Sequence, residues 1–178
     1  MAEATKVFDP EKLPVPDGAE FNHRRVGGIS YRTKGAVQEL FERNQRALVQ
    51  LKWKELPNSY LSDMACSGTF SQSGYFLTLS TSPAGADEVL VTLQNHGNIN
   101  LKKLPVPGGA KPFYGLPTNE AYLVSTNRDQ TAAEVTQLLG KQGWEPYGSA
   151  GDLLYFKQHA VRLGVNVATA PARREIRR

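Results

Sequence analysis

The chain has 178 residues, of which 40% are apolar, 9% aromatic and 21% charged; these proportions exclude a disordered chain and fit one globular domain or two small ones. Its formal charge of +4 is uneven, because residues 101–178 carry 11 lysines and arginines against 6 acids, whereas residues 1–100 carry 10 against 11. A single cysteine, Cys66, excludes an intramolecular disulfide and a cysteine-based zinc cluster.

The N-terminal residues lack the apolar core of a signal peptide, and no segment has the apolar length of a membrane span. We therefore expect a soluble protein without a membrane partner, and the compartment stays open.

The most informative pattern is an internal repeat with an offset of 91 residues. Leu13–Pro16 and Leu104–Pro107 both read Leu-Pro-Val-Pro, and each continues through one variable residue into Gly-Ala. The same offset separates three further pairs, which are Tyr31 and Tyr122, Leu48 and Leu139, and Trp53 and Trp144. Because the chain has only two tryptophans and seven tyrosines, the pattern predicts duplication of one structural unit. The predicted boundaries are an extension over 1–12, a first repeat over 13–100, a second repeat over 101–168 and a basic, disordered tail over 169–178.

In the first copy, Ile29–Thr33 has the composition of a strand, and the apolar residues of 37–51 recur at helical spacing. Lys52 stands where the second copy has Gly143, so we expect this helix to fray or to run on. Past Trp53 the offset falls from 91 to 86, which places five extra residues within Glu55–Gly68. Alternating strands then follow around Phe70 and Tyr75, and Glu88–Leu93 adds a further strand.

In the second copy, Ala121–Ser125 predicts a strand, and Asn127 with Gln130 three residues later predicts a helix N-terminus. Gly143 predicts the end of that helix, and a turn is expected around Gly148–Gly151. Leu153–Phe156 and Val161–Val167 predict two antiparallel strands.

These elements predict an α+β fold, a tandem duplication of a β-α-β-β(-β) unit with helices packed on antiparallel sheets. The second copy has no counterpart of Glu88–Leu93, so an edge strand is missing there or the chain is cut from a longer array. An exposed edge at that place would allow self-association or pairing with an extended peptide.

Four repeated aromatic residues are the candidates for ligand binding, Trp53, Trp144, Tyr31 and Tyr122. They could line a pocket, but large aromatics more often fill the junction between a helix and a sheet. The three histidines lie far apart without paired spacing, which argues against a metal site. Cys66 has no histidine nearby in the sequence to act as its base, and no cofactor loop is present.

We therefore expect a non-enzymatic binding or protein-interaction module without a cofactor, with a protein or peptide as its partner. The alternative is a nucleic-acid-binding protein. It would use Arg24, Arg25 and the four arginines of the tail, which are Arg173, Arg174, Arg177 and Arg178.

Overall fold

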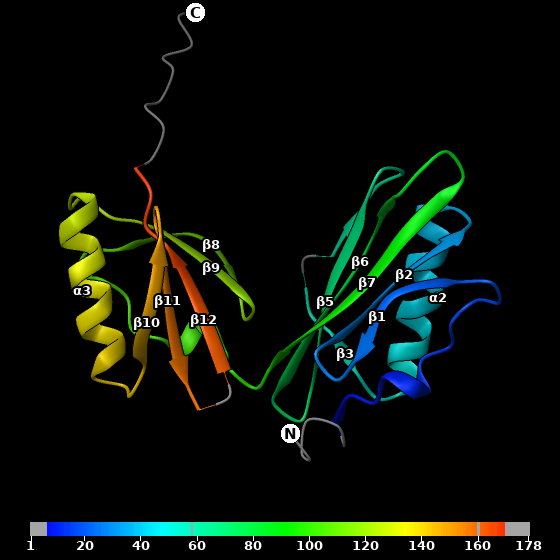
Figure 1. Ribbon diagram of the computed structural model, residues 1–178, viewed down its shortest axis with the longest axis horizontal. Helices are drawn as coiled ribbons and strands as arrows, with labels where there is room; N and C mark the ends of the chain where they lie inside the picture. The colour runs from blue at the N-terminus through cyan, green and yellow to red at the C-terminus, as the bar shows by residue number, and fades with distance from the viewer. Residues whose placement is uncertain (1–6, 58, 160, 170–178) are drawn as a thin grey trace, which may run out of the picture. The chain divides into compact units, whose positions relative to one another are not determined.

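In the computed structural model, residues 7–57, 59–159 and 161–169 are described, and the chain divides into two compact units between Ile99 and Asn100 (Figure 1). Within the described residues, each unit combines one α-helix with antiparallel strands, so the fold is α+β as the sequence predicts.

The first unit is built on a seven-stranded antiparallel sheet. Its strands are β1 (Glu20–Arg25), β2 (Gly28–Lys34), β3 (Lys54–Glu55), β4 (Tyr60–Leu61), β5 (Cys66–Gln72), β6 (Tyr75–Pro83) and β7 (Glu88–Gly97). Their order is β1-β2-β7-β6-β5-β3, and β4 pairs with the other end of β5. The last strand of the first unit, β7, therefore lies in the centre of the sheet, between β2 and β6. The sequence had suggested an edge strand at this place.

The helix α2 (Val37–Gln50) covers one face of this sheet (Figure 1). Strand β7 shows why, because Val89, Val91 and Leu93 are buried and the residues between them are half-buried. Such alternation gives a strand one apolar face, which the apolar stripe of the helix covers. Phe8 and Leu13 from the N-terminal segment, next to the 3-10 turn η1 (Pro10–Lys12), are buried in the same core.

The end of α2 corrects one expectation from the sequence. The helix neither frays nor runs on, because Lys52 itself adopts the left-handed conformation with φ of 71°. The amide of Trp53 then donates to the Leu48 carbonyl at 2.9 Å and closes the last turn. A lysine here serves as the helix terminator that is usually a glycine.

The second unit contains two separate sheets. After the turn η2 (Leu101–Lys103), a hairpin of β8 (Lys111–Leu116) and β9 (Asn119–Leu123) leads to the helix α3 (Arg128–Gly140). A three-stranded meander follows, formed by β10 (Glu145–Ala150), β11 (Leu153–Gln158) and β12 (Val161–Asn166). As predicted, the Asn127 side chain caps the helix, because Oδ1 accepts from the Gln130 amide at 3.0 Å.

Two further expectations for the units were wrong. Each helix follows a hairpin and not a single strand, because β1 and β8 precede the strands that the sequence predicted. The turn expected around Gly148–Gly151 begins later, since Gly148 lies within β10 opposite Tyr155. Gly148 pairs with β11 directly after a β-bulge, which lies between Pro146 and Gly148.

Candidate functional site

Tyr31 lies in the hydrophobic core of the first unit, where it is 1% exposed. Its hydroxyl donates to Asn44 Oδ1 at 3.2 Å, in an arrangement that also allows Asn44 Nδ2 to donate to the hydroxyl at 3.1 Å. Burial raises the pKa of the Tyr31 phenol, and the bond to Asn44 opposes that rise. The side chain is enclosed by protein and ties the sheet to α2.

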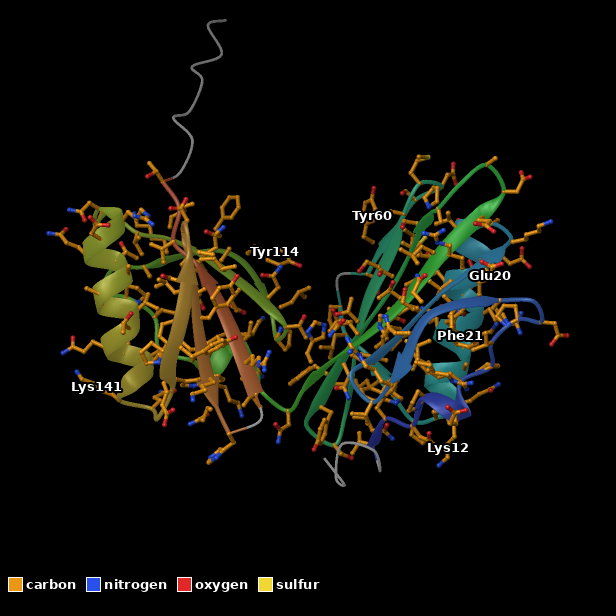
Figure 2. The ribbon with its side chains drawn as sticks, viewed as in Figure 1. Lys12, Glu20, Phe21, Tyr60, Tyr114 and Lys141 are labelled. Carbon is orange, nitrogen blue, oxygen red and sulfur yellow. The ribbon has the colours of Figure 1, made fainter. Side chains whose placement is uncertain are left out.

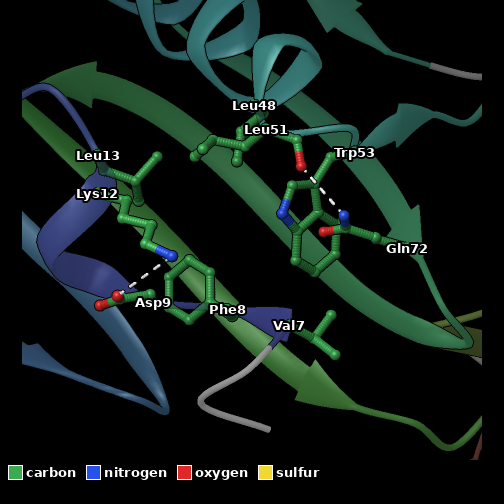
Figure 3. Close-up of a pocket in the computed structure, with 9 residues that line it drawn as sticks. All are labelled: Val7, Phe8, Asp9, Lys12, Leu13, Leu48, Leu51, Trp53 and Gln72. Carbon is green, nitrogen blue, oxygen red and sulfur yellow. Dashed lines mark hydrogen bonds and ion pairs between the residues drawn. The ribbon is translucent and has the colours of Figure 1, made fainter.

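Trp53 is equally enclosed and borders the small pocket of Figure 3. The ring of Phe8 meets the indole edge-on, with centroids 6.3 Å apart. Gln72 Nε2 donates to the Leu51 carbonyl at 3.0 Å, while Gln72 Oε1 is buried without a hydrogen-bond partner among the described residues. The pocket has a volume of about 110 Å³, below the several hundred that an organic ligand requires.

The corresponding aromatic residues of the second unit are placed differently. Trp144 is buried, and its amide donates to the Leu139 carbonyl at 3.1 Å. Tyr122 is half-buried, and its hydroxyl donates to Glu120 Oε2 at 2.7 Å. That hydrogen bond, with burial and the charge of Glu120, raises the pKa of the Tyr122 phenol. Within the first unit, the residues that line the pocket include Trp53 and not Tyr31.

Among the described residues, β9 and β12 of the second unit each pair on one side only. In the first unit β7 pairs with β2 on one side and with β6 on the other. Among the described residues of the second unit, β9 pairs only with β8, and β12 pairs only with β11. Unpaired backbone groups at such an edge can bind another strand.

The hairpin β8–β9 also carries exposed apolar side chains. Phe113 is 74% exposed and Leu123 is 51% exposed, and Tyr114, labelled in Figure 2, is 45% exposed. Tyr114 lies opposite Ala121, two residues from Leu123, so Tyr114 and Leu123 share one face of the hairpin. None of these three residues was predicted from the sequence, although two adjacent aromatic residues, Phe113 and Tyr114, are a signal that the sequence contains.

Of the two arginines of β1, Arg24 is held by contacts within the first unit. Arg24 donates twice to the Pro10 carbonyl, pairs with Glu11 at 3.1 Å, and stacks over the Phe21 ring at 5.2 Å. Arg25 is exposed at the end of the strand. Arg173, Arg174, Arg177 and Arg178 lie outside the described residues.

Cys66 is buried in β5 and donates to the Ser62 carbonyl at 3.4 Å. No cluster of three or more histidine, cysteine or acidic side chains with metal-binding geometry occurs among residues 7–57, 59–159 and 161–169. Neither described helix is long and apolar enough to cross a membrane.

Comparison with known proteins gives no relative. No protein-family model, curated protein or solved structure matches the chain. The candidate site is therefore defined by geometry alone, as the hairpin β8–β9 and the unpaired edges of β9 and β12.

Proposed function

We propose that the two units are copies of one β-β-α-β-β-β module, which in the first unit is followed by the strand β7. The turns η1 and η2 support this, because each begins with a side-chain cap 91 residues from the other. Asp9 accepts from the Glu11 amide, and Asn100 accepts from the Lys102 amide. The hairpins support it too, since both have their register shift at the same relative place, between Phe21 and His23 and between Pro112 and Tyr114.

The ends of the helices and the turns after them give independent support. Lys52 and Gly143 are both left-handed, 91 residues apart, and Ser73 and His159 are both left-handed, 86 residues apart. Gln72 and Gln158, again 86 apart, each donate to a backbone carbonyl at the end of the preceding helix. Local geometries that recur at both sequence offsets favour common descent over chance.

The function that we propose for this scaffold is that of a non-enzymatic binding module for a protein partner, bound at the hairpin β8–β9. One observation carries the proposal, namely the apolar exposed face of that hairpin. The residues 91 positions earlier are Asn22, His23 and Arg32, which are polar, whereas the second unit has Phe113, Tyr114 and Leu123. Exposed apolar groups of this size mark interaction surfaces. A difference confined to one copy of a shared scaffold points to function and not to folding.

Affinity capture from cells that contain the protein tests this proposal. The parent chain and the Phe113→Ser/Leu123→Ser variant are compared at about 0.1 M and about 0.5 M salt, with and without nuclease. We expect specific partners that survive high salt and nuclease and that the variant no longer binds, because contacts of large apolar groups dominate such interfaces.

The matched control is Tyr60→Ser/Met64→Ser in the first unit, whose side chains are equally exposed. It should keep the partners. Partners that the hairpin variant retains would contradict the proposal. Partners lost to salt and nuclease would favour nucleic-acid binding instead.

A further inference from the structure

Among its described residues, the second unit has no strand that corresponds to β7 of the first unit. In the first sheet, β2 and β6 flank β7 on either side. The strands that correspond to them by sequence offset are β9 and β12, and they end two different sheets. In the second unit, β9 pairs with β8 on one edge and β12 pairs with β11 on one edge. The other edge of each strand is open, and it corresponds to the edge at which β2 or β6 pairs with β7 in the first unit.

We propose that the second unit binds an extended segment of a partner polypeptide between β9 and β12, antiparallel to both, as a seventh strand. This rests on the duplication and on the binding function proposed above, and it adds the chemistry of the partner and its place. Such a segment would join the hairpin and the meander into one continuous sheet. The binding mode is strand addition, in which backbone hydrogen bonds give affinity and alternate side chains give selectivity.

Burial indicates the apolar character of the missing strand. Leu77 and Leu79 of β6 are fully buried beside β7. Their counterparts 86 residues later, Leu163 and Val165 of β12, are only half-buried. The partner therefore needs apolar side chains at every second residue on the face toward α3, as β7 has in Val89 and Val91.

At one position, the partner strand should carry a different kind of side chain from that in β7. Leu93 of β7 lies opposite Ile29 on one side and Leu79 on the other. The residue at the place of Ile29 is Glu120, whose Oε1 is buried without a hydrogen-bond partner in the described part of the chain. A cationic or hydrogen-bonding side chain fits opposite this carboxylate better than leucine does.

Two other sources of the strand fit this place less well. In a second copy of this chain, β7 already pairs along both edges, and its transfer would open a complete sheet. Residues 170–178 read Ala-Pro-Ala-Arg-Arg-Glu-Ile-Arg-Arg, with Ile176 as the one large apolar side chain, so this sequence lacks the required alternation.

Backbone hydrogen exchange on the full chain tests the proposal directly. The probe is a synthetic peptide with the sequence of Glu88–Gln94 and Leu93→Lys, and the control peptide carries Thr92→Pro in addition. Proline removes an amide donor and does not fit a central strand, while the charge of the peptide is unchanged. Exchange is followed by NMR at Glu120–Leu123 and Val161–Asn166, with β2 and β6 as internal references because their sheet is complete.

We expect the probe to slow exchange about 10-fold or more in both β9 and β12, with no change in β2 or β6 and no effect of the proline peptide. Equal exchange with and without the probe overturns the inference. So does protection already present in the peptide-free monomer, which would mean that the chain fills the place itself. Protection that arises only as the protein concentration rises would identify a second copy as the occupant. Hydrogen exchange with the peptide does not depend on the affinity capture with the Phe113→Ser/Leu123→Ser variant. The strand-addition proposal can therefore fail while the proposed binding function holds, and the reverse.

Discussion

Tyr122 donates its hydroxyl hydrogen to Glu120 Oε2 at 2.7 Å, two residues earlier on the same strand. In the first unit, Ile29 and Tyr31 occupy the corresponding places, and the tyrosine bonds to Asn44 on the helix instead. The residue 91 positions after Asn44 is Val135, which has no polar group to offer. Both tyrosines keep a partner, but only the first ties a helix to its sheet. The hairpin of the second unit thus lacks a polar tie to α3 that its counterpart has to α2.

The bond between Tyr31 and Asn44 should contribute measurably to the stability of the first unit. Asn44→Leu leaves the Tyr31 hydroxyl buried without a partner, at a cost of about 2 kcal/mol in the free energy of unfolding. Tyr31→Phe costs about 1 kcal/mol, and the double variant should be more stable than the sum by about 1 kcal/mol. Urea unfolding followed by tryptophan fluorescence in a Trp144→Phe background, in which Trp53 is the remaining tryptophan, measures the cycle. Strict additivity would show that the two residues do not interact.

Glu120→Gln should lower the pKa of the Tyr122 phenol toward 10.0. The hydrogen bond to the carboxylate is the main cause of the raised value, followed by burial and the negative charge. The amide keeps an acceptor but removes the charge. Tyrosine ring-carbon resonances followed against pH report this titration, and the Tyr31 resonance serves as the unchanged reference in the same sample. A titration of Tyr122 identical to that of the parent would exclude the carboxylate as the cause.

The sequence predicted the parts of the fold whose signals are local. Strand alternation located β6, β7 and β12, and Asn127 located the start of α3. The strands β1 and β8 were missed because Glu-Phe-Asn-His-Arg-Arg is polar and Lys-Pro-Phe-Tyr-Gly-Leu contains proline and glycine. Pairing with a neighbour, and not intrinsic preference, makes these segments strands. The duplication stays a proposal, supported by matched geometries.

The candidate site was only partly predictable, because strand order is a long-range property. The sequence could show that residues 101–169 hold no counterpart of Glu88–Leu93, but it could not show that this strand is central in the first sheet. Alternation shows that a strand has one apolar face and leaves its neighbours undefined. Likewise, Tyr31 and Trp53 could be recognised as repeated, whereas their enclosure in the core depends on residues such as Phe8 that are distant in sequence.

His96 should make the first unit less stable in acid. Burial lowers its pKa below 6.5, and its Nε2 lies 2.9 Å from Thr78 Oγ1. The unfolded chain therefore binds a proton at a higher pH than the folded chain does. The contribution of neutral His96 to the free energy of unfolding is fully present above about pH 6.5. It is lost as the pH falls toward the pKa of His96 in the folded chain. His96→Gln should reduce this dependence in thermal unfolding between pH 7.5 and 5, and an acid slope equal to that of the parent would count against a role for His96.

Lys52→Gly should stabilise the first unit by about 1 kcal/mol, because a left-handed residue with a Cβ is strained and glycine is not. The second unit already has Gly143 at the matching place, with φ of 82°. Gly143→Ala should therefore destabilise by a similar amount. Lys54→Gly is the control, since that exposed residue lies in β3 and glycine weakens strands. Thermal unfolding of the three variants measures the effects, and a loss of stability in Lys52→Gly would contradict the assignment of strain.

Gly28→Ala and Asn119→Ala should differ sharply, although the two residues occupy corresponding places. Gly28 has φ of 150°, and a Cβ there would overlap with the Leu93 carbonyl oxygen of β7. We expect Gly28→Ala to cost about 3 kcal/mol, since neither the backbone of β7 nor the dihedral can adjust cheaply. Among the described residues Asn119 pairs only with Leu116 of β8, and it already carries a side chain, so Asn119→Ala should change stability by less than about 0.5 kcal/mol. Urea unfolding compares the variants. An equal loss of stability in both variants would mean that a strand of the second unit already occupies the edge of β9 opposite β8. The open edge would then not exist.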